Sequence, residues 1–370
     1  MKQVAHLTSV HQRSDIRIFL KQCRSLARSG YVVSLIVADG KGNGERDGVR
    51  ILDTGASRGR LDRMLGATRR VLAKAVEVDA DIYHIHDPEL LFAGLTLKRR
   101  GKIVIFDAHE DLPQQILSKP YLYEWVRSPL SKVVTVVEAQ ICRRLDAVVG
   151  ATPAITKNFV RTAKTPVNIN NFPMIGELDN RLSWTEKKNE VCYVGGISAI
   201  RGIIPVVDSL AMCKSDARLN LAGEFAESAT KTRAEHRDGW TKVDAHGFVT
   251  REGMRELLSR SVAGIVTFLP EPNHVEAQPN KMFEYMSAGL PVIASDFPLW
   301  REIIEGADCG LCVDPIDPAA IAGAIDRLVQ DPALARRMGE NGRHAVETKY
   351  NWGVEEQKLL DLYRKLLTRA

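Results

Sequence analysis

The sequence predicts an α/β protein made of two Rossmann-like, doubly wound domains that face each other across a cleft. Three observations lead to this prediction. The chain has 370 residues, which is enough for two domains of ordinary size. Short runs rich in β-branched residues alternate with amphipathic segments of helical length, the pattern of parallel βαβ units. The alternation pauses near residue 175 and restarts near residue 191.

The first half alternates strands with helices from its first residues. Residues 16–29 form an amphipathic stretch that stops at Gly30, and residues 89–99 form another that stops at Gly101. The expected strands are residues 4–7, 32–37, 49–52, 82–85, 103–106 and 147–149, and the expected helices are residues 16–29, 60–76, 89–99, 130–144 and 153–162. We assign residues 1–175 to an N-terminal Rossmann-like domain.

A polar segment, residues 176–190, is expected to link the two halves. The expected strands beyond it are residues 191–194, 219–222, 264–269 and 291–294, and the expected helices are residues 203–213, 251–259, 280–288, 319–329 and 334–348. Residues 191–350 therefore form the C-terminal domain. Residues 351–370 contain a last amphipathic helix, which we expect to pack back on the N-terminal domain.

Composition indicates a globular protein that stays in the cytoplasm. Hydrophobic residues make up 45% and charged residues 26% of the chain. No apolar run approaches the roughly 18 residues of a membrane span, and the N-terminus shows no secretory signal pattern.

Charge is distributed unevenly between the two halves. Residues 1–175 carry 27 Lys and Arg against 17 Asp and Glu, whereas the remainder carries 24 against 29. The basic half is either an ordinary solvated surface or a face for an anionic membrane or lipid-phosphate partner. Nucleic acid is disfavoured as a partner, because the basic stretches lack interleaved aromatic residues.

One helix start carries a cation where the helix dipole disfavours it. Pro279 suits the first helical position, and Gly289 suits the position just past the helix end. Lys281 then lies in the first turn, at the positive end of the dipole, where a cation is unfavourable by about 0.3–1 kcal/mol. An anion bound by the backbone N–H groups and Lys281 together would remove this conflict.

The same pattern occurs after the strand at residues 191–194. Gly195 and Gly196 permit a tight turn and close backbone approach, and Arg201 lies at the start of the next helix. Because both helix starts follow strands of one sheet, we expect Arg201 and Lys281 to share one diphosphate.

Glu276 and Glu284 are eight residues apart, the first in the loop before the helix and the second in its second turn. They cannot form an acid–base pair on one helix face, so we expect them to contact different parts of one ligand. Glu284 is expected to accept hydrogen bonds from ribose hydroxyls, and Glu276 to lie nearer the reacting sugar.

The stretch from Glu276 to Glu284 resembles the E-x7-E motif of the retaining GT-B-fold glycosyltransferases that build glycolipids, capsules and O-antigens. The similarity extends through residues 193–202, 221–223, 246–249, 288–294, 310–314 and 337–342. The N-terminal half looks like a branch that makes bacterial surface polysaccharides, through residues 11–19, 81–87 and 107–110.

The resemblance implies a role for individual residues. Glu276 and His109 would be catalytic. The donor would be bound by Gly195, Gly196, Arg201, Phe248, Asn280, Lys281 and Glu284. The acceptor-side candidates are His11, Asp15, Arg17, His86, Asp87 and Glu110.

Three segments depart from the family pattern. Gly196 stands where the family often has Arg, which leaves Arg201 as the only cation of that loop. Residues 9–15 replace the usual glycine-rich loop after the first strand. Gln278 and Pro279 stand where Phe-Gly is common, so one backbone donor is lost and the anion depends more on Asn280 and Lys281.

No metal site is expected. Asp79 and Asp81 form a DxD pattern, but they precede a strand and are interpreted as a helix-to-strand turn. His86 and His109 each follow a strand near carboxylates, yet a whole βα unit separates them and no third ligand is evident. A polar lining that orients sugar hydroxyls is the simpler interpretation.

The predicted function is metal-independent, cofactor-free and retaining transfer of a sugar from a nucleotide-diphosphate donor to a glycan or lipid-linked acceptor. UDP is favoured over GDP on family frequency alone. The leaving diphosphate, stabilised by Arg201, Asn280 and Lys281, would accept the acceptor's proton. The alternatives are a sugar-nucleotide epimerase or hydrolase on the same fold, and a non-catalytic sugar-nucleotide-binding subunit of a polysaccharide assembly complex.

Overall fold

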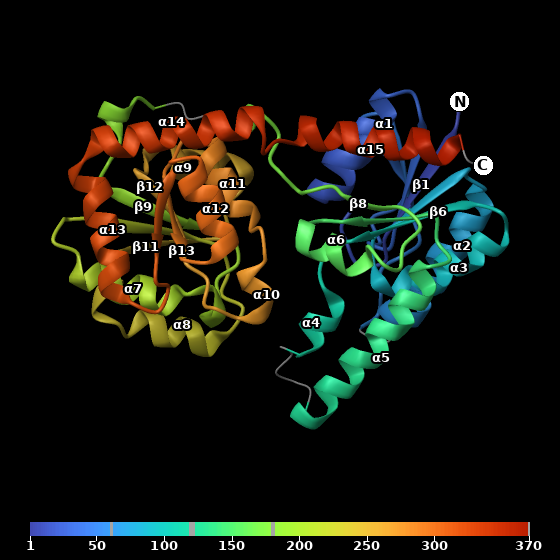
Figure 1. Ribbon diagram of the computed structural model, residues 1–370, viewed down its shortest axis with the longest axis horizontal. Coiled ribbons are helices and arrows are strands. Elements are labelled where there is room, and N and C mark those ends of the chain that lie inside the picture. The colour runs from blue at the N-terminus through green and yellow to red at the C-terminus, as the bar shows by residue number, and fades with distance from the viewer. Residues whose placement is uncertain (60–61, 118–122, 179–181, 369–370) are drawn as a thin grey trace. The chain divides into compact units, whose positions relative to one another are not determined.

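A computed structural model describes residues 1–59, 62–117, 123–178 and 182–368, and this part of the chain forms two compact units. One unit comprises Met1–Asn171 with Trp352–Ala370, and the other comprises Phe172–Asn351 (Figure 1). Each unit contains a mainly or wholly parallel sheet, and apart from β2, β3 and β4, which lie within residues 32–53, its successive strands are connected through helices. The predicted pair of Rossmann-like domains is thus confirmed.

The sheet of the first unit has the order β3-β4-β2-β1-β5-β6-β7-β8, and β3 alone pairs antiparallel with its neighbour. Its strands are β1 (Gln3–Leu7), β2 (Val32–Val37), β3 (Gly44–Arg46), β4 (Val49–Asp53), β5 (Ile82–Ile85), β6 (Ile103–Ala108), β7 (Ala147–Gly150) and β8 (Pro166–Asn168). The strands β3 and β8 were not expected, because three residues are too few to show an alternating pattern. The chain leaves β1 for β2 on one side, and β5 lies on its other side, so β1 marks the switch point of this sheet.

The helices of the first unit mostly lie where the sequence places them. They are η1 (Ile16–Cys23), α1 (Arg24–Arg28), η2 (Asp62–Ala67), α2 (Thr68–Val78), η3 (Pro88–Leu90), α3 (Leu91–Arg99), α4 (Leu112–Leu117), α5 (Glu124–Cys142), α6 (Pro153–Phe159) and α15 (Trp352–Leu367). The prediction began α5 at residue 130, after Pro129, but the helix continues through this proline. Among the described residues no helix is both long and apolar enough to cross a membrane.

The last helix, α15, returns to the first unit and packs beside η1 (Figure 1). The indole Nε1 of Trp352 donates to Ser25 Oγ at 3.0 Å. Glu355 is 1% exposed, and its carboxylate accepts from the backbone N–H and the side-chain Nδ2 of Asn170 at 2.8 and 3.2 Å. Buried polar contacts of this kind fix the rotation and register of the helix on the unit.

The second unit contains a six-stranded parallel sheet of order β11-β10-β9-β12-β13-β14. Its strands are β9 (Glu190–Val194), β10 (Arg218–Ala222), β11 (Val243–Gly247), β12 (Ala263–Val266), β13 (Val292–Ser295) and β14 (Gly310–Val313). Its helices are η4 (Trp184–Glu186), η5 (Ala199–Arg201), α7 (Ile203–Met212), α8 (Ser228–Glu235), η6 (Asp238–Lys242), α9 (Arg251–Arg260), α10 (Pro272–Val275), α11 (Asn280–Ser287), α12 (Pro298–Gly306), α13 (Pro318–Gln330) and α14 (Pro332–Thr348).

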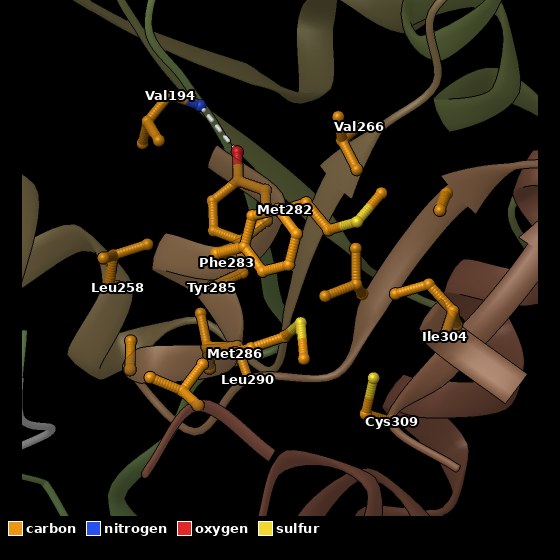
Figure 2. Packing of buried hydrophobic residues seen from close by; sticks show 14 of the residues in the cluster. Val194, Leu258, Val266, Met282, Phe283, Tyr285, Met286, Leu290, Ile304 and Cys309 are labelled. Carbon is orange, nitrogen blue, oxygen red and sulfur yellow. Dashed lines mark hydrogen bonds between the residues drawn. The ribbon is translucent and has the colours of Figure 1, made fainter. Parts of the chain in front are cut away.

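The helix α11 packs into the core beneath this sheet. Met282, Phe283, Tyr285 and Met286 lie in one apolar cluster with Val194 and Val266 (Figure 2). The hydroxyl of Tyr285 accepts from the backbone N–H of Val194 at 3.0 Å (Figure 2). This contact ties α11 to the end of β9, which brings the helix start near the loop that follows β9.

The segment predicted as a linker, residues 176–190, belongs to the second unit over its described part. Leu178 is fully buried in the core of that unit, and Glu177 pairs with Arg251 at 2.8 Å. Lys187 donates to the carbonyls of Ser259 and Ser261 at 2.8 and 2.6 Å. The sequence of residues 176–190 did not predict these contacts, because the segment is polar and each contact is made with residues far along the chain.

Candidate active site

The first cluster lies at the carboxyl edge of the second sheet, where β9 has β10 on one side and β12 on the other. Ligands of open α/β sheets bind at such a switch point. Gly195 follows β9 with φ +93°, and Gly223 follows β10 with φ +149°. A Cβ on Gly223 would stand 2.0 Å from the carbonyl oxygen of Gly195, so these two loops approach as closely as backbones can.

Lys281 lies in the first turn of α11, as expected, although Pro279 is the N-cap rather than the first helical residue. Its Nζ lies 3.7 Å from the ring centroid of Tyr193 and has no hydrogen-bond partner within the described part of the chain. Burial, together with the positive charge of Arg201, holds the pKa of Lys281 well below its usual value. A buried, unpartnered cation at a helix N-terminus is suited to bind an anion.

Arg201 ends the short helix η5, and Gly202 then starts α7 in the left-handed region at φ +76°. The Arg201 Nη1 donates to the carbonyl of Gly196 at 3.1 Å. A Cβ on Gly196 would lie 2.4 Å from that Nη1, so glycine is required for the guanidinium to fold over the loop. Arg201 Cζ and Lys281 Nζ lie 5.8 and 5.5 Å from the same Phe268 ring, which brings the two predicted cations together.

Glu284 lies in α11 one turn beyond Lys281 and pairs with Arg251 Nη1 at 2.7 Å. Arg251 also pairs with Glu177, so Glu284 is held in a three-membered ionic network that the sequence did not reveal. One oxygen of Glu284 is thus engaged and its side chain is only 17% exposed. The network fixes the rotamer of a carboxylate that could accept from ribose hydroxyls.

Glu276, Asn280 and Phe248 are exposed at the same edge of the second sheet. Glu276 caps the short helix α10, and the indole of Trp300 fixes the following loop by donating to the carbonyl of Ala277 at 2.7 Å. Asn280 is the first residue of α11. Phe248 follows β11 with 78% of its surface exposed. Among the described interactions, no hydrogen bond or ion pair joins these three residues to Arg201 or Lys281.

The second cluster lies at the switch point of the first unit and centres on Asp107, a residue that the sequence analysis did not single out. Asp107 is fully buried and accepts from Arg17 Nε and Nη2 at 3.0 and 2.7 Å and from Gln22 Nε2 at 2.7 Å. Burial would raise the pKa of Asp107, but the charge of Arg17 and the contacts with His109 hold it well below its usual value. Arg17 therefore supports Asp107 and is itself only 4% exposed.

The imidazoles of His86 and His109 meet beside Asp107. His86 Nδ1 lies 3.2 Å from His109 Nε2, and each of these nitrogens lies 3.4 Å from Asp107 Oδ2. His86 is buried, whereas the side chain of His109 remains 17% exposed and can reach a ligand. A βα unit separates His86 from His109 in the sequence. The two residues are nevertheless close in space, because β5 pairs with β6.

The other acceptor-side candidates surround this cluster. The Asp87 carboxylate accepts from Thr8 Oγ1 at 2.9 Å and lies 3.5 Å from His11 Nε2. Asp15 caps η1 and lies 3.3 Å from His11 Nδ1. Burial alone would raise the pKa of Asp15, but its bonds from His11 and from the Ile18 N–H lower it to about 2. Glu110 is exposed and bonds to Gln115 of α4.

Two sets of three side chains lie close enough to hold a metal ion: His6, His84 and His86, and His86, Asp107 and His109. Asp107 is the third group that the sequence did not reveal beside His86 and His109. Its carboxylate is already neutralised by Arg17, and a second cation beside that guanidinium would be repelled. The DxD pattern lies elsewhere, since Asp79 ends α2 in the left-handed region and Asp81 accepts from the N–H of Gln3.

Family models match both units. Residues 175–345 match the model described as glycosyl transferases group 1, and residues 17–169 match the model described as glycosyl transferase 4-like domain. The chain belongs to the group 1 glycosyltransferases.

Individual relatives of this group 1 glycosyltransferase are distant. The alpha-D-kanosaminyltransferase of Streptomyces kanamyceticus is 26% identical over 180 residues, 48% of this chain and 45% of that protein. The chain thus spans about half the length of the first curated relatives that it matches.

Solved structures share the fold over the whole chain. Sucrose-phosphate synthase from Thermosynechococcus elongatus aligns with a TM-score of 0.80 at 20% identity, covering 100% of both chains. Anabaena Alr3699/HepE in complex with UDP-glucose aligns with a TM-score of 0.74 at 16% identity, covering 99% of this chain and 100% of that one.

The site residues that sequence reasoning missed in this group 1 glycosyltransferase are supporting groups. Asp107 was detectable, because it lies near the end of β6 and two residues before His109, which follows that strand. Arg251, Gln22 and Tyr363 gave no signal, because their partners lie far along the chain. These partners are Glu284 for Arg251, Asp107 for Gln22, and the Nδ1 of His84, 2.9 Å away, for the hydroxyl of Tyr363.

Proposed function

We propose that the chain transfers a sugar from a nucleoside-diphosphate donor, with UDP favoured, to a glycan or lipid-linked acceptor with retention of anomeric configuration. The single observation that carries this proposal is the buried ammonium of Lys281, which lies without a hydrogen-bond partner beside Arg201 and a glycine loop. A diphosphate is the anion that two cations and two helix starts would bind together. The relative solved with UDP-glucose supports a UDP donor.

The proposed mechanism needs neither a metal nor a cofactor. As the glycosidic bond breaks, negative charge grows on the leaving diphosphate, and Arg201, Lys281 and the N–H groups around Asn280 stabilise it. Preorganised groups of this kind commonly lower a barrier by about 3–4 kcal/mol each. The leaving phosphate takes the proton of the attacking hydroxyl, and Glu276 positions the donor sugar. His109 of the first unit is the second catalytic candidate, and its side chain is 17% exposed.

Replacing Glu276 by Gln tests this mechanism. We expect the variant to bind UDP as the native chain does and to lose about 100-fold or more in kcat, because an interaction made with the reacting sugar is lost while the diphosphate contacts remain. Thermal shift with UDP, GDP and ADP measures binding, and product analysis with and without an acceptor measures transfer. Nearly full transfer by Glu276→Gln would overturn the role of Glu276. Turnover of the donor that needs no acceptor would identify a hydrolase or epimerase instead.

The acceptor is proposed to reside at an anionic membrane surface on the cytoplasmic side, as in bacterial polysaccharide and glycolipid synthesis. The helix α5 supports this, because one face presents apolar side chains to solvent: Trp125 is 78%, Val133 58% and Val136 60% exposed. Tyr123 stacks on Trp125 with ring centroids 6.4 Å apart. An apolar face with aromatic residues at one end and basic residues at the other is typical of helices that lie in the membrane interface.

The basic groups near this face remain available for lipid phosphates. Lys132, Arg143 and Arg144 are exposed and form no ion pair among the described residues. By contrast, Lys98 pairs with Asp146 at 2.8 Å and Lys102 pairs with Asp79 at 2.8 Å, so part of the basic sequence serves the fold itself.

The double variant Trp125→Ser/Val136→Ser tests the membrane surface. We expect the native chain to sediment with vesicles containing phosphatidylglycerol and not with pure phosphatidylcholine. The variant should bind about 10–100-fold more weakly, since each buried apolar side chain contributes about 1.5–3 kcal/mol at most. Met212→Ser, on the second unit and 52% exposed, is the matched control and should bind normally. Unchanged binding by the double variant would reject α5 as the docking helix, and loss of a dimer in solution would identify α5 as a self-association surface.

A further inference from the structure

A third cation lies at a helix start of the second unit. Thr250 caps α9 through its side chain, which accepts from a backbone N–H of the first turn at 3.3 Å, and Arg251 is the first helical residue. The helix dipole disfavours a cation at this position, as it does at Lys281. Lys281 forms no ion pair within the described residues, whereas Arg251 pairs with two carboxylates of its own unit. The protein itself therefore supplies the counter-charge for Arg251.

The guanidinium of Arg251 joins two carboxylates from segments that are distant in the sequence. Its Nε donates to Glu177 Oε1 at 2.8 Å, and its Nη1 donates to Glu284 Oε1 at 2.7 Å. Nη1 also donates to Met254 Sδ at 3.3 Å, in the next turn of the same helix. Because a guanidinium is planar and rigid, these contacts together fix the position of the Glu284 oxygen that it binds.

The two carboxylates of this network differ in what they offer to a ligand. Oε2 of Glu177 is buried and has no hydrogen-bond partner. Glu284 uses only Oε1 in the contacts of the described residues, and its side chain is 17% exposed, so its Oε2 can reach a ligand. One guanidinium and two carboxylates are negative overall, which favours hydroxyl donors over phosphate groups.

Glu284 also lies beside the cation of its own helix. It follows Lys281 by three residues in α11, so the two side chains share one helix face and are separated by about 4.5 Å along the axis. In a nucleoside diphosphate the ribose is bonded directly to the phosphates. A ligand whose diphosphate binds Lys281 therefore has its ribose hydroxyls within reach of Glu284.

We propose that Arg251 is a positioning residue for Glu284, and that this ion pair makes the site select ribonucleotides over deoxyribonucleotides. Arg251 holds Oε1, and Oε2 then accepts from a ribose hydroxyl of the donor. The contact with ribose rests on the proposed transfer function, whereas the ionic network does not. Without Arg251 the carboxylate would adopt several rotamers, and the ligand would have to immobilise it at a loss of about 3–10-fold in affinity.

Calorimetric titration of the full chain tests this selectivity. The ligands are whichever of UDP, GDP and ADP binds most tightly, its 2′-deoxy and 3′-deoxy forms, and pyrophosphate. We expect the native chain to prefer the ribonucleotide over at least one deoxy form by about 10–100-fold, because a hydrogen bond to a charged group is lost. Arg251→Met should reduce this preference by about 3–10-fold and should bind pyrophosphate, which has no ribose, as the native chain does.

Three further variants separate positioning from folding. Arg251→Lys should recover part of the preference, because it restores the charge without the planar fork. Glu177→Gln leaves Arg251 and Glu284 in place and should reduce the preference less than Arg251→Met does. Arg218→Met is the matched control and should keep the native preference. Arg218 donates to both oxygens of Asp244 at 2.9 and 2.6 Å, but it lies at the amino end of β10, away from the carboxyl edge of the sheet.

Native preference in a folded Arg251→Met chain, or in Glu177→Gln where Arg251→Met does not fold, would overturn the proposal. Equal weakening of the ribonucleotide, its deoxy forms and pyrophosphate would also overturn it, because Arg251 would then serve the fold alone. A native chain that binds no nucleoside diphosphate would reject both this proposal and the proposed function. If the expected preferences are observed but no acceptor supports transfer, the proposed function fails and the role of Arg251 stands.

Discussion

Replacing Lys281 by Met is expected to stabilise the ligand-free protein and to abolish donor use at the same time. The Nζ of Lys281 is buried and unpartnered, which costs about 1–3 kcal/mol in the free energy of unfolding. Met has a similar volume and no charge to desolvate. The stabilised variant should nevertheless lose about 100–1,000-fold in kcat/KM, because it lacks a cation at the leaving diphosphate.

The pH dependence of this stability gain follows from the pKa of Lys281. Burial and Arg201 lower the pKa in the folded state, so between the folded and unfolded values the unfolded chain binds more protons. Lys281 therefore lowers the free energy of unfolding at neutral pH. This destabilisation decreases as the pH rises towards about 10.4, the pKa of Lys in the unfolded chain. The advantage of Lys281→Met should shrink in the same range, as thermal unfolding measured at several pH values would show.

Lys187 provides a control of opposite sign. It is half-buried, and this burial lowers its pKa to about 8, but its Nζ donates to the carbonyls of Ser259 and Ser261. Lys187→Met should destabilise the protein by about 1–3 kcal/mol, because two carbonyls lose their donor, and should leave UDP binding unchanged. A destabilised Lys281→Met that still responds to UDP would contradict the anion-site interpretation.

Removing the charge of Asp107 should produce the largest loss of stability. Asp107→Asn leaves the guanidinium of Arg17 buried without its counter-ion, and breaking such a pair costs about 3–5 kcal/mol. Since the folded-state pKa of Asp107 is lowered, the native pair contributes above about pH 4 and is lost as pH falls further. The native chain and the variant should therefore converge in strong acid.

Hydrogen exchange in β1 and β6 reports unfolding of the first unit separately from the second. The control is the exposed ion pair Arg336–Glu340 of the second unit. Glu340→Gln breaks this pair and should change the free energy of unfolding by less than about 1 kcal/mol. The double variant Arg17→Met/Asp107→Asn should recover part of the loss, because the orphaned charge is removed. If Asp107→Asn alone were as harmless as Glu340→Gln, the pair would not support the cluster.

Local rules predicted most of the fold and the proximity of Lys281 to Arg201. Pro279, Gly289 and the strand before them were enough to place Lys281 in a helix start, and the structure brings it to Arg201 as expected. The rest depends on partners distant in sequence. Glu177 forms an ion pair with Arg251, 74 positions away, and Tyr363 forms a hydrogen bond with His84, 279 positions away. Periodicity and capping are local signals, so they carry no information about such pairs.

The return of α15 determines how the protein can be divided. The second unit, Phe172–Asn351, is one continuous stretch, so it offers a natural fragment for testing the proposed nucleotide binding in isolation. The first unit is discontinuous. In a fragment ending at Asn171, Ser25 would lose its hydrogen bond from Trp352, and Asn170 would lose its hydrogen bond to Glu355. Dissection of the two halves therefore requires a fragment in which the final helix is joined back to Met1–Asn171 through a designed connection.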